Sequence, residues 1–180
     1  SLATSTLKLM KKGSTAFQNI SLLKNCALYD VYPTWNMLVG FPGELEEVYQ
    51  KYMVDLPLLV HLPPPSGVHQ VRFDRFSPYF NDPKAYGLEL APMDHYGLIY
   101  PFPQAEIENL AYFFKDKNYD AEYFTHLVRW ITKVRQLVAT WRDRWPFSDP
   151  GARAQLYVKQ QDNGLLLRDT RSGSVVEYAL

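Results

Sequence analysis

The short motif with the most chemical potential is Gly40-Phe41-Pro42-Gly43-Glu44, which follows a run of β-forming residues. At the carboxyl end of a parallel strand, glycines let the backbone approach a ligand closely, and the amides of such a turn can bind it. The same residues also suit a tight strand-to-helix turn that binds nothing. The motif is neither a phosphate-binding loop nor a dinucleotide fingerprint, because it lacks their glycine and lysine spacing. The residues themselves leave both interpretations open.

Other side chains that could bind a metal or act as nucleophiles are scattered. Asp74, Asp82, Asp94 and His95 fit the spacing of no known metal-binding loop, so we predict neither a metal site nor a catalytic residue in this chain. The single cysteine, Cys26, lies on an apolar helical stripe and is predicted to be a packed core thiol. One thiol cannot form a zinc site or hold an iron–sulfur cluster.

The elements that would position the glycine turn form an α/β unit. Residues 31–39 alternate in polarity and are rich in β-branched and aromatic side chains, which predicts a strand that ends at the turn. Residues 45–52 follow with helical spacing, and residues 69–76 alternate again as a second strand. A strand, a turn and a helix in this order are the building block of parallel α/β folds. Residues 57–61 are predicted to be extended.

The remaining segments are predicted to be a long loop, several helices and a terminal sheet. Residues 77–103 have the composition of an irregular loop, and loops of this length are typically functional. Helices are predicted over residues 4–12, 14–27, 105–115 and 120–145. A small antiparallel meander is predicted from residues 154–160, the Asp162-Asn163-Gly164 turn, residues 165–169 and residues 174–180.

The composition restricts the partners and the compartment. The 180 residues carry 19 basic and 19 acidic side chains, so the formal net charge is zero. This balance gives no reason to expect nucleic acid or an anionic membrane as a partner. A single cysteine excludes a disulfide framework and favours a reducing compartment, so we expect the protein in the cytoplasm. No apolar run approaches the roughly 18 residues of a membrane-spanning helix.

Several segments together resemble a known family. The run Trp35–Glu44 is similar to the fifth barrel strand of radical S-adenosylmethionine (SAM) enzymes. Further similar segments are Leu9–Ala16, His61–Gly67, Arg72–Phe80, Tyr96–Pro101 and Leu110–Phe114. Together they resemble the group that modifies ribosomally made precursor peptides, often as cobalamin-dependent C-methyltransferases. The similarity covers residues 4–115.

The resemblance implies a fold and a function. It implies an α/β chain in which residues 1–103 form a partial (β/α) barrel, the closing strands of a radical SAM barrel. A helical extension is expected over residues 104–150, and the β meander over residues 151–180 is a candidate start of a further domain. The chain would then be the carboxy-terminal part of a larger enzyme, an iron–sulfur oxidoreductase or methyltransferase that matures a ribosomal peptide.

The resemblance also assigns roles to individual residues of the two predicted strands and the segment after them. The positions implied to contact the cofactor are Asn36, Leu38, Gly40, Val71 and Phe73. The positions implied to face the peptide substrate are Asp74, Arg75, Ser77 and Tyr79. Gly43 stands where the family has a glutamate, so the backbone contact from Leu38 is the part of the pattern that carries over.

The expected cofactors are SAM and a [4Fe–4S] cluster, and the resemblance leaves open whether cobalamin is used. The three cluster-binding cysteines of the family are missing here, so the rest of a parent chain must hold the cluster, and the isolated chain is expected to be inactive. The expected partners are that parent chain and a precursor peptide.

An open half-barrel would leave a strand edge unpaired. We therefore expect the chain to self-associate, or to fold a loop or the terminal meander over that edge. The alternative function is a non-catalytic module that binds a peptide or a protein partner through its aromatic loops.

Overall fold

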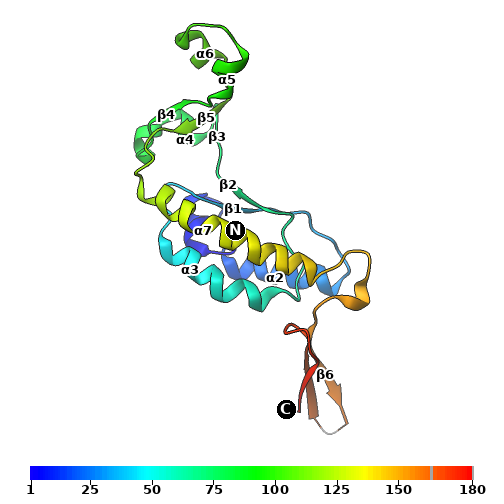
Figure 1. Cartoon of the computed structure of the whole chain (residues 1–180). Coiled ribbons are helices and arrows are strands. Elements are labelled where there is room, and N and C mark those ends of the chain that lie inside the picture. Colours follow the sequence, from blue (N-terminus) through cyan, green and yellow to red (C-terminus); the bar gives the residue numbers. More distant parts are fainter. Residues whose placement is uncertain (163, 180) are drawn as a thin grey trace.

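The computed structural model describes residues 1–162 and 164–179, and it is a mixed α/β structure with three parts (Figure 1). In the central body, helices pack against one face of a small parallel sheet. An arm, made of residues 71–121, projects from one end of the body, and a β meander projects from the other end. The molecule is therefore elongated, with its helical layer in the middle.

The central body is a strand–helix–strand unit on which further helices pack. Its elements are α1 (Thr4–Leu9), α2 (Ala16–Leu28), β1 (Met37–Val39), α3 (Glu46–Asp55), the 3₁₀ helix η1 (Leu56–Leu59), β2 (Val68–Gln70) and α7 (Glu122–Asp143). β1 and β2 pair in parallel, with Met37 opposite Val68, and α3 lies between them in the chain. α7 returns from the arm and packs against α3 and β2. The predicted parallel α/β unit is confirmed.

The parallel sheet has two strands, and no barrel closes within residues 1–162 and 164–179. One face of the pair is covered, because Met37, Val39 and Val68 are buried in the core formed with α3 and α7. The opposite face, which carries Leu38 and His69, borders a cleft whose lining comes from α1, the two strands and the arm. The meander does not cover this face.

A tryptophan at the centre of the body holds α7 in place. Trp141 is fully buried, and its indole nitrogen donates a hydrogen bond to the Leu62 carbonyl at 2.7 Å. Its ring packs edge-on against Trp35, with ring centroids 6.0 Å apart. The hydrogen bond ties α7 to the proline-rich segment before β2, in which Pro63 and Pro65 are also fully buried.

The arm is built around a three-stranded antiparallel sheet in the order β3-β5-β4. Its elements are β3 (Phe73–Asp74), α4 (Pro78–Asn81), the 3₁₀ helix η2 (Pro83–Tyr86), β4 (Leu90–Pro92), α5 (His95–Ile99), α6 (Gln104–Leu110) and β5 (Phe113–Asp116). The buried residues of its hydrophobic cluster are Phe73, Leu88, Ala111, Phe114 and Tyr123. Because Tyr123 belongs to α7, this cluster joins the arm to the central body.

The predicted strand over residues 69–76 is wrong as a single element, because it is two strands in different sheets. The Val71 amide still donates to the Val39 carbonyl of the parallel pair at 2.9 Å. The Arg75 amide instead donates to the Tyr112 carbonyl in the arm at 2.7 Å. The alternating pattern predicts which side chains share a face, but it carries no information about which strand lies alongside.

The predicted helix over residues 105–115 ends at Leu110, and its last part is β5 instead. Ala111 is extended and buried, so the apolar residues whose spacing resembled a helix pack in the core of the arm instead. The predicted loop over residues 77–103 contains α4, η2, β4 and α5. Each of these elements is only a few residues long, so none of them produces a recognisable hydrophobic periodicity in the sequence.

Other predictions near the core are confirmed or shortened. Thr15 caps α2 with the predicted capping box, and Cys26 is buried in that helix. The strand predicted over residues 31–39 is limited to β1. Residues 57–61, expected to be extended, lie mostly in η1, where Pro57 suits the first helical turn. No helix in the described part of the chain is long and apolar enough to cross a membrane.

The predicted meander is confirmed as a three-stranded antiparallel sheet in the order β6-β7-β8. Its elements are the 3₁₀ helix η3 (Pro150–Ala152), β6 (Leu156–Gln161), β7 (Gly164–Asp169) and β8 (Val176–Ala179). Asn163 of the predicted turn and Leu180 of the predicted last strand lie outside the described residues. Arg171 pairs with Asp169 at 2.7 Å and donates to the Leu58 carbonyl at 2.9 Å, which attaches the meander to η1.

Replacing Trp141 with alanine is expected to destabilise the protein by about 4 kcal/mol. The substitution leaves a large buried cavity and removes the hydrogen bond that the indole donates to the Leu62 carbonyl. Val128→Ala, at an exposed position of the same helix, is the matched control and should cost less than about 0.5 kcal/mol. Urea unfolding followed by circular dichroism measures both changes. Similar losses for the two variants would show that α7 does not depend on the Trp141 contact.

Candidate functional site

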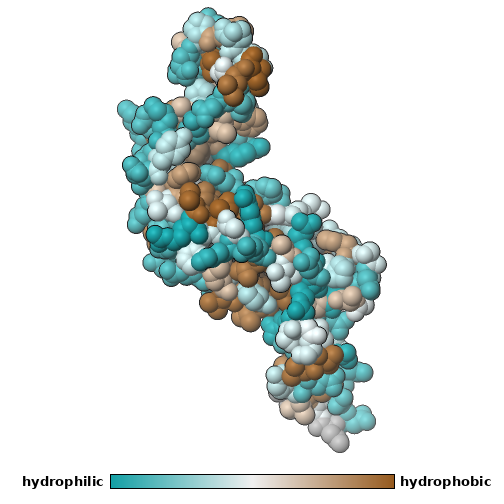
Figure 2. All heavy atoms as spheres, in the orientation of Figure 1, coloured by the Kyte–Doolittle hydropathy of each residue, from teal (hydrophilic) through white to brown (hydrophobic). Residues whose placement is uncertain are grey.

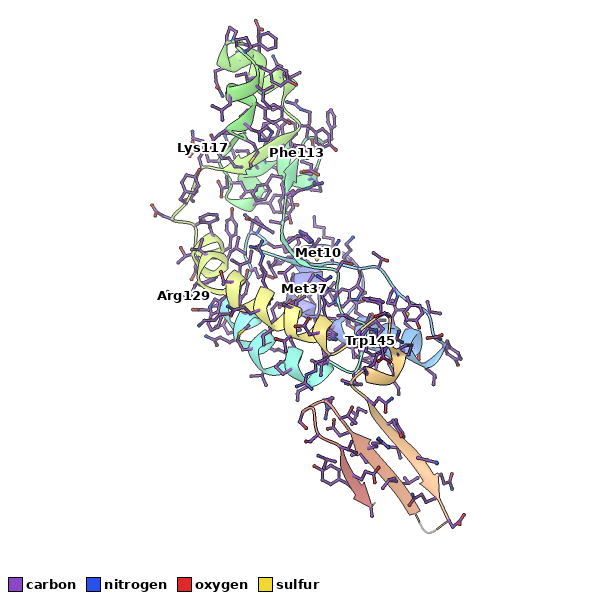
Figure 3. All side chains as sticks on the ribbon, turned by 45° about the vertical axis from the view of Figure 1, so that its right-hand side comes forward. Met10, Met37, Phe113, Lys117, Arg129 and Trp145 are labelled. Atoms are coloured by element: carbon purple, nitrogen blue, oxygen red, sulfur yellow. The ribbon has the colours of Figure 1, made fainter. Side chains whose placement is uncertain are left out.

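The candidate site is a cleft of about 570 Å³ on the open face of the β1–β2 pair, where the central body meets the arm. Leu38 and His69, which are opposite each other in the parallel register, line it together with Asn36 and Val71. Met10, just past the end of α1, lies at this junction of body and arm and lines the cleft as well (Figure 3). The cleft therefore collects residues from segments that are far apart in the chain.

The arm side of the cleft is aromatic. The Tyr79 ring packs edge-on against Phe73 and Tyr86, with ring centroids 5.4 and 4.7 Å away. Burial raises the pKa of the Tyr79 phenol above its usual value, and Tyr86 and the charge of Glu44 add to the rise. Tyr79 is therefore neutral near pH 7 and offers an apolar ring with one hydroxyl group. Such a wall suits a flat ring of a ligand.

Positive charge exceeds negative charge in the cleft. Lys11 and Lys12 contribute two ammonium groups, and Arg72 contributes a guanidinium. The Arg72 guanidinium donates to a carboxylate oxygen of Asp74 at 2.9 Å, which balances one cation. Within the described residues no ion pair neutralises Lys11 or Lys12. This arrangement favours a ligand that carries an anionic group such as a carboxylate.

Among the described residues, the second carboxylate oxygen of Asp74 has no hydrogen-bond donor. The atom Oδ1 is buried, and none of the described residues donates to it. Leaving a buried acceptor unpaired costs about 1–3 kcal/mol, so a hydroxyl or amine group of a ligand would relieve the cost. Asp74 lines the cleft and also a second cavity, of about 460 Å³.

The structure brings some of the residues assigned from the sequence together and separates others. Those that line the cleft are Asn36, Leu38, Val71, Asp74 and Tyr79. Those that lie elsewhere are Gly40, Phe73, Arg75 and Ser77. Phe73 is buried in the core of the arm, and the Ser77 hydroxyl caps α4. Arg75 donates to the carbonyls of Glu108 and Ala111, so its guanidinium holds α6 against β3.

Some cleft residues were missed by the assignment from sequence. Lys11 and Lys12 follow the last turn of α1, where cations commonly complement the helix dipole, so they resembled ordinary helix-end charges. His69 has a clearer signal. Its position two residues before Val71 places both side chains on one face of an extended strand, and that face is the cleft.

The glycine turn beside the cleft is held by a buried carboxylate. Glu44 is 2% exposed, and one of its oxygens accepts a hydrogen bond from the Thr6 hydroxyl of α1 at 2.5 Å. Its other oxygen accepts from the Gly40 amide at 2.6 Å and from the Tyr49 hydroxyl of α3 at 2.8 Å. One side chain therefore connects α1, the turn and α3.

Gly40 is required by the fold. Its φ of 78° lies in the left-handed region, which favours glycine. A Cβ atom at this position would come within 2.9 Å of the Leu127 side chain of α7. Since the amide of Gly40 is bonded to Glu44, the turn is structural at this residue, which is the second of the two interpretations left open by the sequence.

No group of three or more His, Cys, Asp or Glu side chains in residues 1–162 and 164–179 is arranged to hold a metal ion. The thiol of Cys26 is buried in α2, away from the residues of the cleft. The groups that the cleft presents to a ligand are therefore apolar surfaces, hydrogen-bonding groups, two ammonium groups and one ion pair.

Glu44→Ala is expected to lower the free energy of unfolding by about 3 kcal/mol, because the buried Gly40 amide and Thr6 hydroxyl lose their acceptor. Glu44→Gln should cost less, about 1 kcal/mol, since the Thr6 hydroxyl can rotate to accept from the new amide group. Glu47→Ala, at an exposed position of α3, is the control and should have little effect. Urea unfolding measures all three variants. A Glu44→Ala variant as stable as the control would contradict the role of this carboxylate.

The protein is expected to lose stability in alkaline solution. Burial raises the pKa of Tyr49 and of Tyr52, with the Glu44 charge contributing to both, and burial together with a hydrogen bond to Asp116 raises the pKa of Tyr123. In the unfolded chain these phenols ionise near pH 10. Their contribution to the free energy of unfolding is therefore complete below about pH 10 and is lost as the pH rises above that value. Urea midpoints measured from pH 8 to pH 11 should fall steeply only above about pH 10, and a constant midpoint would contradict the expectation.

Comparison with known proteins found no match: no family model, no curated protein and no solved structure matches the chain. The function has to be argued from the residues of the cleft.

Proposed function

We propose that this chain supplies the adenosine-binding and substrate-facing part of a radical SAM enzyme that modifies a ribosomally made peptide. The observation that supports the proposal is the convergence of five of the nine assigned residues. Asn36 and Leu38 come from β1, Val71 follows β2, and Asp74 and Tyr79 come from the arm, yet all of them line one cleft. The assignment used sequence resemblance alone, so their meeting in space is an independent observation.

The residues of the cleft fit an adenosyl amino acid. An adenine ring requires apolar surfaces on its faces and a few polar groups at its edge, and Leu38, Val71 and Tyr79 offer the former while Asn36 offers the latter. The ammonium groups of Lys11 and Lys12 suit the carboxylate of the methionine moiety. The unpaired oxygen of Asp74 suits a hydroxyl or an amine group. The role of this chain is thus to bind and orient.

In the proposed enzyme, β1 and β2 are the closing strands of the barrel, and further parallel strands of the parent protein lie beside them. The open face with Leu38 and His69 would then point to the barrel interior. Active sites of such barrels lie at the carboxyl ends of the strands. The arm follows directly after β2, so it would stand at that end, next to the peptide substrate.

The iron–sulfur cluster does not fit this chain. Its thiolate ligands number at least three, and the single cysteine, Cys26, is buried in a helix of the core. In the proposal, the cluster belongs to the rest of the parent protein, where bound SAM supplies radical chemistry by reductive cleavage. Whether cobalamin takes part is left open. Self-association of the isolated chain remains a prediction, because among the described residues no further strand pairs with the outer edge of β1 or of β2.

A second candidate function is a non-catalytic module that binds a protein or peptide partner. It is favoured by the tip of the arm, where Leu98 is 86% exposed and Ile99 and Phe102 are exposed beside it. Large apolar side chains gathered on a protruding surface often mark an interaction site. Figure 2 shows hydrophobic residues at this end of the molecule.

The decisive experiment uses the complete parent protein, produced without oxygen and given SAM and a reductant. It is expected to bind iron and to release 5′-deoxyadenosine. Leu38→Trp should fill the cleft and slow SAM cleavage by roughly 100-fold, because the cofactor is displaced, while the iron content stays the same. Leu45→Trp, at an exposed position outside the cleft, is the control and should retain activity. If the complete protein binds no iron and cleaves no SAM, the binding-module function takes its place.

A further inference from the structure

A pocket of about 360 Å³ lies between β2 and the second half of α7. Its polar and charged side chains are those of Ser66, His69, Arg135 and Arg142, and none of the described aspartates or glutamates lines it. We refer to this space as the edge pocket. Because two guanidinium groups face it without a carboxylate, the edge pocket favours an anionic ligand.

The backbone of β2 directs alternate residues toward the edge pocket. The Met37 amide of β1 donates to the Gly67 carbonyl at 3.0 Å. The Val71 amide donates to the Val39 carbonyl of β1 at 2.9 Å. Successive residues of a strand direct their backbone groups to opposite sides, so Gly67 and Val71 face β1 while Val68 faces the outer edge.

Arg135 reaches this outer edge from α7. Its Nε atom donates to the Val68 carbonyl at 3.4 Å, which agrees with the outward direction of Val68. The Val68 amide is on the same side of the strand, and no further strand of the described residues lies beside it. A guanidinium has five N–H donors, so Arg135 keeps donors for a ligand. The wall of the edge pocket therefore combines backbone and guanidinium donors.

The positive charge of the edge pocket is not compensated by the described residues. Arg142 follows Arg135 by about two helical turns, so both lie on one side of α7. Neither guanidinium forms an ion pair with a described residue. Asp143 lines an adjoining pocket but not this one. Arg129 of the same helix, in contrast, pairs with Glu46 at 2.8 Å.

The donors approach from two directions, which favours a phosphate over a carboxylate. The guanidinium groups come from α7, whereas the Val68 amide and the Ser66 hydroxyl come from β2 and the segment before it. A carboxylate has two oxygens in one plane, but the three terminal oxygens of a phosphate monoester can accept from several directions. Guanidinium groups also bind phosphate through pairs of parallel hydrogen bonds.

The adjoining pocket, of about 350 Å³, offers an apolar surface next to the two arginines. Ala139 and Arg142 line both pockets. The adjoining pocket is also lined by Trp145, Pro146 and Phe147. Figure 3 labels Trp145 just past the end of α7 that lies away from the arm. A ligand with its anionic group between the arginines can therefore place an apolar group on this surface.

From these observations we propose that the edge pocket binds a phosphate monoester whose apolar substituent lies against Pro146 and Phe147. Arg135 and Arg142 pair with the phosphate, and the Val68 amide donates to one of its oxygens. The evidence comes from β2 and α7 and uses none of the assignments to SAM, so this proposal goes beyond the proposed function and does not depend on it.

The test is a nuclear magnetic resonance titration of the chain with phenyl phosphate at constant ionic strength. Saturable shifts are expected for the amide signals of residues 66–69 and for the Nε–H signals of the two arginines. Benzoate should bind about tenfold more weakly, because it has fewer acceptor oxygens and less charge. Inorganic phosphate should bind about fivefold more weakly, because it lacks the apolar group. Equal affinity for benzoate overturns the assignment to phosphate, and equal affinity for inorganic phosphate overturns the contact with Pro146 and Phe147.

Basic residues of α7 provide matched variants. Arg135→Gln and Arg142→Gln should each weaken binding of phenyl phosphate about tenfold, because a charge-assisted pair is lost. Lys133→Gln removes the same charge from the same helix but outside the edge pocket, and it should change the affinity less than about twofold. Thermal unfolding of each variant verifies the fold. The absence of saturable shifts, or equal losses for all three variants, overturns the proposal, whatever the outcome of the SAM experiment.

Discussion

The carboxylate of Glu44 is the interaction on which the arrangement of the central body depends. A carboxylate removed from water is stable only when donors surround it, and here the donors come from three elements: Thr6 in α1, Gly40 in the turn and Tyr49 in α3. The same contacts fix the direction in which the chain leaves β1. They also hold α1 beside the turn, so that the residues just past the end of this helix, Lys11 and Lys12, reach the cleft. The position of Lys11 and Lys12 at the cleft thus depends on a buried carboxylate that does not itself line the cleft.

A second constraint is the exchange of sheet partners after β2. The backbone bonds to Val39 at Val71 and to Tyr112 at Arg75, so within a few residues it leaves the parallel pair and enters the arm. The segment between Val71 and Arg75 therefore lies between the two sheets and is not covered completely by either of them. Asp74 borders both the cleft and the second cavity, and the two spaces also share Gln70, Val71 and Arg72 in their linings.

Local patterns were reliable where one element satisfies its own requirements. The capping box at Thr15, the long amphipathic α7 and the terminal meander depend on neighbours in the chain, and each is present. The patterns failed where a segment is shared between structures. The helical spacing after residue 105 was produced by the core of the arm, in which Ala111 and Phe114 are buried without being on one helix. The prediction of one strand over residues 69–76 was wrong, because alternation along a strand does not identify the neighbouring strand.

By itself, the sequence determined that the chain is an α/β protein with a strand–turn–helix unit, a long helix near the end and a terminal meander, because periodicity and turn residues are local properties. The resemblance to radical SAM enzymes also assigned Leu38 and Val71 to one ligand space, and both residues line the cleft. The tertiary structure alone decided that the parallel sheet has two strands and that Gly40 is bonded within the fold. It alone placed Lys11, Lys12 and Arg72 around the same cleft as Leu38. The physical reason is that these outcomes depend on which distant segments pack together, and a pattern along the chain does not contain that information.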